Sequence, residues 1–201
     1  MRELLLASAS PRRAALLEQI GVPFRRLAPP EIDETPAPGE APDDYVQRMA
    51  REKALRGWAP GGREEANRFA VLGADTTVTI DGAILGKPRD LEDAREMLWR
   101  LAGREQQVLS AVSVVTDQWQ ETRLGEARVR MRPDMGEHIE AYLATGEPFG
   151  KAGAWAIQGF GEVLVEHLAG SYSAVVGLPL AQTQPLLARA GVPWWQSPGS
   201  G

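Results

Sequence analysis

Short apolar runs alternate along this chain with segments of helical periodicity, and this alternation is the feature that most restricts its fold. A chain of this kind buries its strands in a sheet and packs its helices against the faces of that sheet. The strand-like runs are residues 3–7, 24–28, 69–74, 76–80, 83–85, 108–116, 121–131 and 163–168. The helix-like segments are residues 11–20, 43–58, 90–102, 134–143 and 180–190. The pattern predicts an α/β fold.

The dipeptide Asp81-Gly82 predicts a β-hairpin, because this pair suits a two-residue type I′ turn between strands. In that hairpin Thr76 would lie opposite Lys87, and Asp75 would be a neighbour of Lys87 at the open end. Asp75 ends an apolar strand, where a carboxylate is costly unless it is paired or bound to metal. Asp75 is therefore part of an ion pair with Lys87, part of a hydrolytic centre, or the cap of a turn.

The segment Ser8-Ala9-Ser10-Pro11-Arg12-Arg13 joins the first strand to the first helix. Ser10 suits the N-cap position of that helix, and Pro11 suits its first residue. Free backbone N–H groups and the positive end of the helix dipole meet there, and two hydroxyls and two guanidiniums add donors. This arrangement suits a diphosphate or triphosphate. The same residues also fit a capped helix with two solvated arginines.

Two further charged segments each allow two interpretations. Glu31, Asp33 and Glu34 can place oxygens around a hard cation such as Mg²⁺, or they can form a solvated acidic loop. Lys53 follows Val46 by seven residues, so both side chains point to the apolar side of their helix. Lys53 therefore either extends its stem over the core or directs its charge into a cleft that holds phosphate.

A glycine-rich segment, residues 153–159, carries one side-chain amide, that of Gln158. An amide both donates and accepts hydrogen bonds, as recognition of a uracil or thymine edge requires. Gln158 also fits a structural or solvated position. His138 and His167 lack the spacing of metal ligands, so we expect them on a helix surface and a strand exterior.

Composition narrows the possible partners of the chain. The 201 residues, 43% of them hydrophobic, provide for one sizeable core or one two-lobed domain. A net charge of −5 argues against binding to polymeric nucleic acid. The apolar run at the N-terminus is too short for a signal peptide, and no run has the length of a membrane span. We therefore expect a cytoplasmic protein that has no membrane partner.

Several short motifs, taken together and in order, resemble the Maf (septum-formation-inhibitor-like) family. They cover about residues 4 to 190 and are Ala7–Arg13, Pro30–Glu34, Ala50–Ala54, Gly73–Thr76, Gly86–Pro88, Lys151–Ala154, Ile157–Gly159 and Val176–Leu180. The resemblance implies a long mixed β-sheet flanked by helices, with two lobes and a central cleft, similar to inosine triphosphate pyrophosphatases. It assigns residues 1–192 to a single two-lobed domain and leaves residues 193–201 as a flexible tail.

The resemblance also implies roles for individual residues. Asp75 matches the proton acceptor. The polar cleft positions that contact phosphate or support catalysis are Lys53, Lys87, Ser8, Arg12 and Arg13. Ser10 is expected to bind substrate together with them. A divalent cation, Mg²⁺ or Mn²⁺, is expected on acids drawn from Asp75, Glu31, Asp33 and Glu34. Arg12, Thr76 and Gln158 stand at the selectivity positions and resemble the branch that acts on dTTP and UTP. Trp155-Ala156 departs from the Tyr-Gly of many relatives.

The resemblance thus implies hydrolysis of a small nucleoside triphosphate, dTTP or UTP, to the monophosphate and pyrophosphate by a homodimer. Two other functions fit the same residues. One is a non-catalytic nucleotide sensor that regulates cell division through a protein partner. The other is a phosphatase that releases single phosphates, which product analysis distinguishes from a pyrophosphatase.

Overall fold

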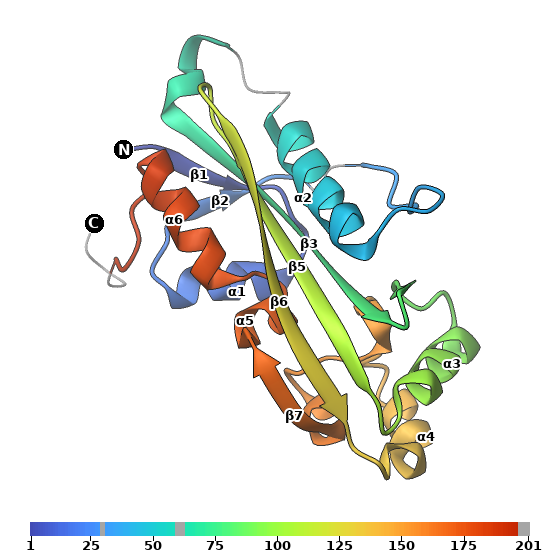
Figure 1. Cartoon of the computed structure of the whole chain (residues 1–201). Helices are drawn as coiled ribbons and strands as arrows, with labels where there is room; N and C mark the ends of the chain where they lie inside the picture. Colours follow the sequence, from blue (N-terminus) through green and yellow to red (C-terminus); the bar gives the residue numbers. More distant parts are fainter. Residues whose placement is uncertain (29–30, 59–62, 197–201) are drawn as a thin grey trace.

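In the computed structural model, which describes residues 1–28, 31–58 and 63–196, a seven-stranded mixed sheet is flanked by helices (Figure 1). The strands are β1 Glu3–Leu6, β2 Phe24–Arg26, β3 Phe69–Ile80, β4 Ala83–Leu85, β5 Glu105–Val115, β6 Gln120–Met131 and β7 Val165–Gly170. The helices are α1 Pro11–Gln19, α2 Pro42–Trp58, α3 Leu91–Leu101, α4 Ile139–Ala144, α5 Tyr172–Val176 and α6 Leu180–Ala190. Short 3₁₀ segments are η1 Arg63–Arg68, η2 Met135–His138, η3 Ala152–Ala154 and η4 Phe160–Leu164. The predicted α/β class is confirmed.

The strand order is β2-β1-β3-β5-β6-β7, and β4 pairs with β3 alone. β1 pairs in parallel with β2 and β3, whereas the other neighbours are antiparallel. The long strands β3, β5 and β6 run through the molecule, with α2 on one side of them and α1, α5 and α6 on the other (Figure 1). Leu109 and Ala111 of β5 pack in one cluster with residues of α2. Val112 and Val114 point to the opposite face, because side chains alternate along a strand.

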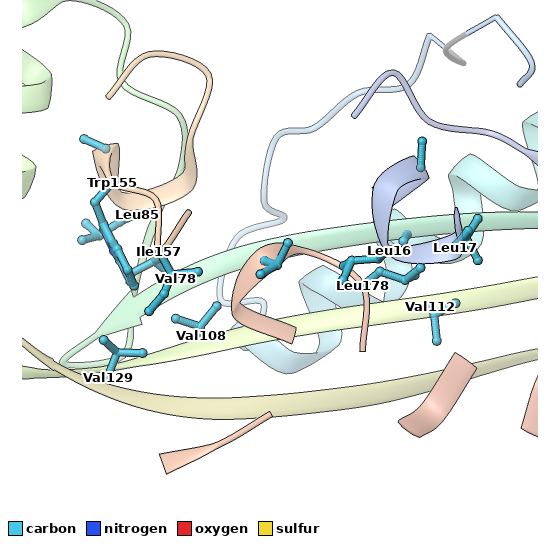
Figure 2. Packing of buried hydrophobic residues seen from close by; sticks show 14 of the residues in the cluster. Leu16, Leu17, Val78, Leu85, Val108, Val112, Val129, Trp155, Ile157 and Leu178 are labelled. Carbon is cyan, nitrogen blue, oxygen red and sulfur yellow. The ribbon is translucent and has the colours of Figure 1, made fainter. Parts of the chain in front are cut away.

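The larger core cluster lies on the face of the sheet opposite α2. Figure 2 shows Leu16 and Leu17 of α1 near Leu178, while Trp155 and Ile157 pack with Val78 and other residues farther along the sheet. Two segments that are distant in sequence are therefore held on one sheet face. This packing places the start of α1 and the segment after Trp155 at a common site, described below.

One long strand replaces two predicted ones. Residues 69–74 and 76–80 form the single strand β3, because β5 pairs with it continuously from Val71↔Val115 to Thr79↔Gln107. Asp75 therefore lies inside a strand, and the alternatives that place it at a strand end or as a turn cap are wrong. The hairpin itself is confirmed: Ile80 faces Ala83, and Asp81 and Gly82 have the positive φ angles, 53° and 74°, of a type I′ turn.

The predicted pairing of Thr76 with Lys87 does not form. The β3–β4 ladder ends at Val78↔Leu85, and Thr76 instead lies opposite Ser110 of β5. Beyond Leu85 the chain leaves β3, since the carbonyl of Gly86 accepts a hydrogen bond from the Gly153 N–H at 3.0 Å.

Three other segments differ from their predictions. The helix expected over 134–143 is divided into η2 and α4, and the Asp134 carboxylate accepts a hydrogen bond from Arg132 Nε at 2.9 Å instead of capping a helix. The strand expected from residue 163 begins at Val165, after η4. Helix α5 was not predicted; it is short, and Ser171 caps it by accepting from the Ala174 N–H at 3.2 Å.

The start of the expected tail is hydrogen-bonded to the end of α1. The N–H of Trp195 donates to the Ile20 carbonyl at 2.7 Å, and that of Gln196 donates to the Gly21 carbonyl at 3.0 Å. Residues 29–30, 59–62 and 197–201, which include most of the predicted tail, lie outside the described residues. None of the described helices combines the length and apolar character needed to cross a membrane.

Candidate active site

A cavity of about 730 Å³ opens between the start of α1, the middle of β3 and the segment that follows η3. Its volume lies in the range of sites that hold small molecules. Among the sequence-predicted site residues, those that line it are Ser8, Ser10, Arg12, Arg13, Glu34, Lys53, Asp75, Thr76, Lys87 and Gln158. The structure thus brings together residues from six separate segments of the chain.

The buried carboxylate of Asp75 is paired with Lys53. Lys53 Nζ lies 2.6 Å from Asp75 Oδ1 and 2.7 Å from Glu34 Oε1, and the exposed fractions of Lys53 and Asp75 are only 8% and 9%. Helix α2 positions Lys53 and β3 positions Asp75, because α2 packs directly across β3. Interior pairs of this kind hold both charges in a defined place, since either charge alone would be costly to bury.

Lys87 joins this cluster through Glu34 rather than through Asp75. Lys87 Nζ lies 3.0 Å from Glu34 Oε2, so the order of contacts is Lys87, Glu34, Lys53, Asp75. The predicted direct ion pair between Asp75 and Lys87 is replaced by this chain of four groups. Partial burial would raise the pKa of Glu34, but the hydrogen bonds and charges of Lys53 and Lys87 outweigh burial and hold the pKa at about 2.

Arg13 is held in a fixed position at the entrance of α1. Its Nε donates to the carbonyl of Gly177 at 2.9 Å, and its Nη1 donates to Oγ of the buried Ser8 at 3.0 Å. Burial lowers the pKa of the Arg13 guanidinium, and the negative charge of Asp75 opposes that effect. An arginine nevertheless stays protonated in proteins, so Arg13 is a fixed cation facing the cavity.

Ser10 occupies the N-cap position of α1, but its side chain makes no capping hydrogen bond within the described structure. The neighbouring Ser8 Oγ instead accepts from the Ser10 N–H at 3.2 Å. The predicted N-cap position of Ser10 is therefore confirmed, but its hydroxyl does not cap the helix. Pro11 begins the helix as predicted.

Thr76 is fixed by a buried polar network that the sequence reasoning missed. Thr76 Oγ1 lies 2.7 Å from Ser110 Oγ, and Ser110 donates to the Ala174 carbonyl at 2.5 Å. Arg13 Nη2 reaches Thr76 Oγ1 at 3.4 Å. Ser110 is fully buried in the apolar strand β5, and a polar residue at such a position was the signal available in the sequence.

Gln158 and Arg12 are the remaining predicted selectivity residues, and both line the cavity. Gln158 is exposed and lines the cavity, directly after the buried residues Trp155 and Ile157. Trp155 Nε1 donates to Oε1 of the buried Gln106 at 3.2 Å, so the tryptophan that departs from the family pattern belongs to the core. Burial lowers the pKa of Arg12, and the charge of Glu147 opposes that effect.

The acids predicted to bind metal fall into two groups. Asp75 and Glu34 line the cavity, but Glu31 and Asp33 do not, and Asp33 instead accepts a hydrogen bond from the Thr35 N–H at 2.9 Å. Within the described ranges no three acids or histidines are grouped so that they could hold a metal by themselves. Mg²⁺ commonly uses one or two carboxylates together with substrate phosphates. The donor set of Asp75 and Glu34 fits that mode of binding.

Comparison with known proteins gives consistent results. The family model described as Maf-like protein matches residues 3–190. A dTTP/UTP pyrophosphatase of Alcanivorax borkumensis is 53% identical over 197 residues, which are 96% of this chain and 98% of that protein. A dTTP/UTP pyrophosphatase of Pseudoalteromonas atlantica is 52% identical over 186 residues, which are 92% and 96% of the two chains.

Solved structures show a more distant likeness. A nucleoside-triphosphatase described as a dITP/XTP pyrophosphatase, from Mycobacterium abscessus, has a TM-score of 0.42 and 19% identity over 93% of each chain. A HAM1 protein from Coxiella burnetii has a TM-score of 0.44 and 17% identity over 66% of this chain and 74% of that one.

Proposed function

Since this chain belongs to the Maf family, we propose that it is a nucleoside triphosphate pyrophosphatase that converts dTTP and UTP to the monophosphate and pyrophosphate. The names of relatives that are about half identical over nearly the whole chain support this substrate class. The observation that carries the proposal is one cavity that is lined by the cations Arg13, Lys53 and Lys87 and by the carboxylate of Asp75, which Lys53 contacts directly. Fixed cations around a carboxylate suit a polyphosphate that is to be hydrolysed.

In the proposed reaction a water oxygen attacks the α-phosphorus, and the bond from that phosphorus to the bridging oxygen breaks. Asp75 accepts the proton of the attacking water, and Lys53 holds Asp75 in position for this transfer. Arg12, Arg13 and Lys87 stabilise the negative charge that develops on the phosphate oxygens. Asp75 and Glu34 would hold Mg²⁺ or Mn²⁺, which neutralises phosphate charge when bound. Pyrophosphate is the leaving group.

The base would be selected at the side of the cavity that holds Gln158. The amide of Gln158 can donate to the O4 carbonyl of uracil or thymine and accept from N3–H. Thr76 and Arg12 complete the proposed selectivity set, and the hydrogen bonds of Thr76 to its neighbours fix its hydroxyl. We further propose that the enzyme acts in the cytoplasm as a homodimer.

The test is incubation of the purified protein with UTP, dTTP, CTP and GTP in the presence of Mg²⁺ or Mn²⁺. Release of UMP with pyrophosphate is the expected result, and chelation of the metal should abolish it. UDP with inorganic phosphate would instead identify a phosphatase. Tight binding of UTP without products would support the nucleotide sensor. Light scattering of the same sample measures the number of subunits.

A further inference from the structure

Glu147 is a partly buried acid that the proposed reaction does not use. It follows α4, and its carboxylate accepts three hydrogen bonds. The N–H of Phe160 donates to Oε2 at 3.0 Å, the N–H of Gly161 donates to Oε1 at 2.8 Å, and the hydroxyl of Tyr142 donates to Oε1 at 2.9 Å. Hydrogen bonds to an ionised carboxylate are among the stronger ones in proteins. The Glu147 side chain thus ties the end of α4 to Phe160 and Gly161, which follow Glu147 by 13 and 14 residues.

The backbone around this carboxylate is shaped to receive it. Gly159 has a φ angle of 115°, which side-chain-bearing residues rarely adopt, and a Cβ there would collide with Glu147 Oε2. A Cβ at Gly161 would collide with the Ala156 carbonyl and lie 2.8 Å from the Tyr142 hydroxyl. The two glycines therefore let the chain close tightly around Glu147, whose carboxylate is the acceptor for the N–H groups of Phe160 and Gly161.

The segment held in this way carries Gln158. Trp155 and Ile157 are buried before it, and the N–H groups of Phe160 and Gly161 are bonded to Glu147 after it. Gln158 itself is exposed to the cavity. Because the Gln158 side chain is exposed, its direction depends on the buried residues before it and on the hydrogen-bonded residues after it.

We propose that Glu147 is a positioning residue for base selection, which holds residues 158–161 so that the Gln158 amide meets the edge of a uracil or thymine. This inference rests on the proposed function, because it gives Glu147 its role through the substrate base. Glu147 also acts electrostatically on Arg12 and Lys151, which line the same cavity. A change in base selection must therefore be separated from a change in phosphate binding.

The main test compares Glu147→Gln with the matched control Glu162→Gln, which changes an exposed glutamate of the neighbouring η4 segment. A glutamine at 147 can accept through one oxygen only, so one backbone N–H loses its partner. We expect the ratio of kcat/KM for UTP to that for CTP to fall about tenfold in Glu147→Gln and to stay unchanged in the control. Hydrogen exchange at the amides of Phe160 and Gly161 should become faster in the first variant only.

A second pair of variants separates geometry from charge and replaces the first if Glu147→Gln does not fold. Phe160→Pro removes one donor to Glu147 but keeps the carboxylate charge, and Phe160→Ala keeps the donor. A UTP-to-CTP ratio that falls in Phe160→Pro but not in Phe160→Ala supports the positioning role. A ratio that falls in Glu147→Gln but not in Phe160→Pro assigns the effect to charge on Arg12 and Lys151, and it overturns the proposal.

The failure of this proposal is distinguishable from failure of the proposed function. Absence of pyrophosphate release by the unsubstituted protein would reject the function alone. Glu147 would then be judged by amide exchange and by the ratio of UMP and CMP affinities in calorimetric titrations. Unchanged exchange at Phe160 and Gly161 in Glu147→Gln, or unchanged base preference, overturns the role of Glu147.

Discussion

At the scale of single residues, the site depends on one buried carboxylate, that of Asp75. Asp75 is 9% exposed and is bonded to Lys53 at 2.6 Å. A buried acid with a charged partner in a cavity is typical of a functional site. The structure places it in the middle of a paired strand, where its backbone position is fixed by β5.

Replacing Asp75 with asparagine should keep the fold and remove the proton acceptor. We expect kcat for UTP to fall about a thousandfold, because both the base and its charge are lost. The measurement is the rate of pyrophosphate release, with circular dichroism to show that the variant is folded. A folded Asp75→Asn protein with nearly unchanged turnover would reject the assignment of Asp75 as base.

Replacing Gln158 with glutamate should change which pyrimidine is preferred. A carboxylate only accepts hydrogen bonds, so it no longer donates to O4 of UTP but can accept from the amino group of CTP. We expect the UTP-to-CTP ratio of kcat/KM to fall at least about tenfold. The rate of pyrophosphate release from CTP should stay similar to that of the unsubstituted protein. An unchanged ratio would remove Gln158 from base selection.

At the scale of elements, the contact of α2 with β3 sets the position of Lys53. Gly73 of β3 lies directly under α2, because a Cβ there would collide with the backbone N of Ala54 and lie 2.5 Å from the carbonyl of Ala50. The backbones of the helix and the strand therefore touch without a side chain between them. Lys53, one residue before Ala54, owes its contact with Asp75 to this close approach.

Gly73→Ala is expected to push α2 away from the sheet. Overpacking of this kind costs about 1–3 kcal/mol of unfolding free energy, and it should also lower kcat by moving Lys53. Gly86→Ala is a suitable control for stability, since a Cβ at Gly86 meets nothing within 4 Å. Denaturant unfolding measures the difference. Equal stability of the two variants would contradict the close packing of α2 on Gly73.

At the scale of the whole molecule, Glu34 connects three segments of the chain. Its carboxylate contacts Lys53 of α2 and Lys87 beyond β4, while its carbonyl accepts from the hydroxyl of Tyr45 at 2.9 Å. Burial, Asp75 and Glu34 raise the pKa of Tyr45 to about 12, so this phenol remains a donor at neutral pH. The acidic loop is thus tied to the remainder of the site by charge.

The pH dependence of stability should report the Glu34 contacts. The folded-state pKa of about 2 lies below the ordinary value of 4.5, so the contribution of this group is present above pH 4.5. It is lost as pH falls from 4.5 towards 2, where the folded protein binds the proton. Unfolding of Glu34→Gln and of the unsubstituted protein should therefore differ at pH 6 and converge towards pH 2. A difference that does not depend on pH would reject this ion pairing.

Much of the fold was already determined by the sequence, because local chemistry decides local structure. The alternation of strand-like and helix-like apolar patterns predicted the α/β class. Asp81-Gly82 predicted the hairpin turn, and Pro11 predicted the start of α1. The segments of the cavity were also predicted: Arg13, Lys53, Asp75, Lys87 and Gln158 all line it.

Tertiary structure alone decided how those residues meet. Pairing with β5 carried β3 through Asp75, and the departure of the chain after Leu85 placed Lys87 on Glu34 instead of Asp75. The proposed role of Glu147 depends on its contacts with Phe160 and Gly161, which lie 13 and 14 residues farther along the chain. Periodicity and capping act within a few residues, whereas ion pairs and buried hydrogen bonds are chosen by which elements pack together. The sequence therefore specifies the parts, and the packing of the sheet with its helices decides their partners.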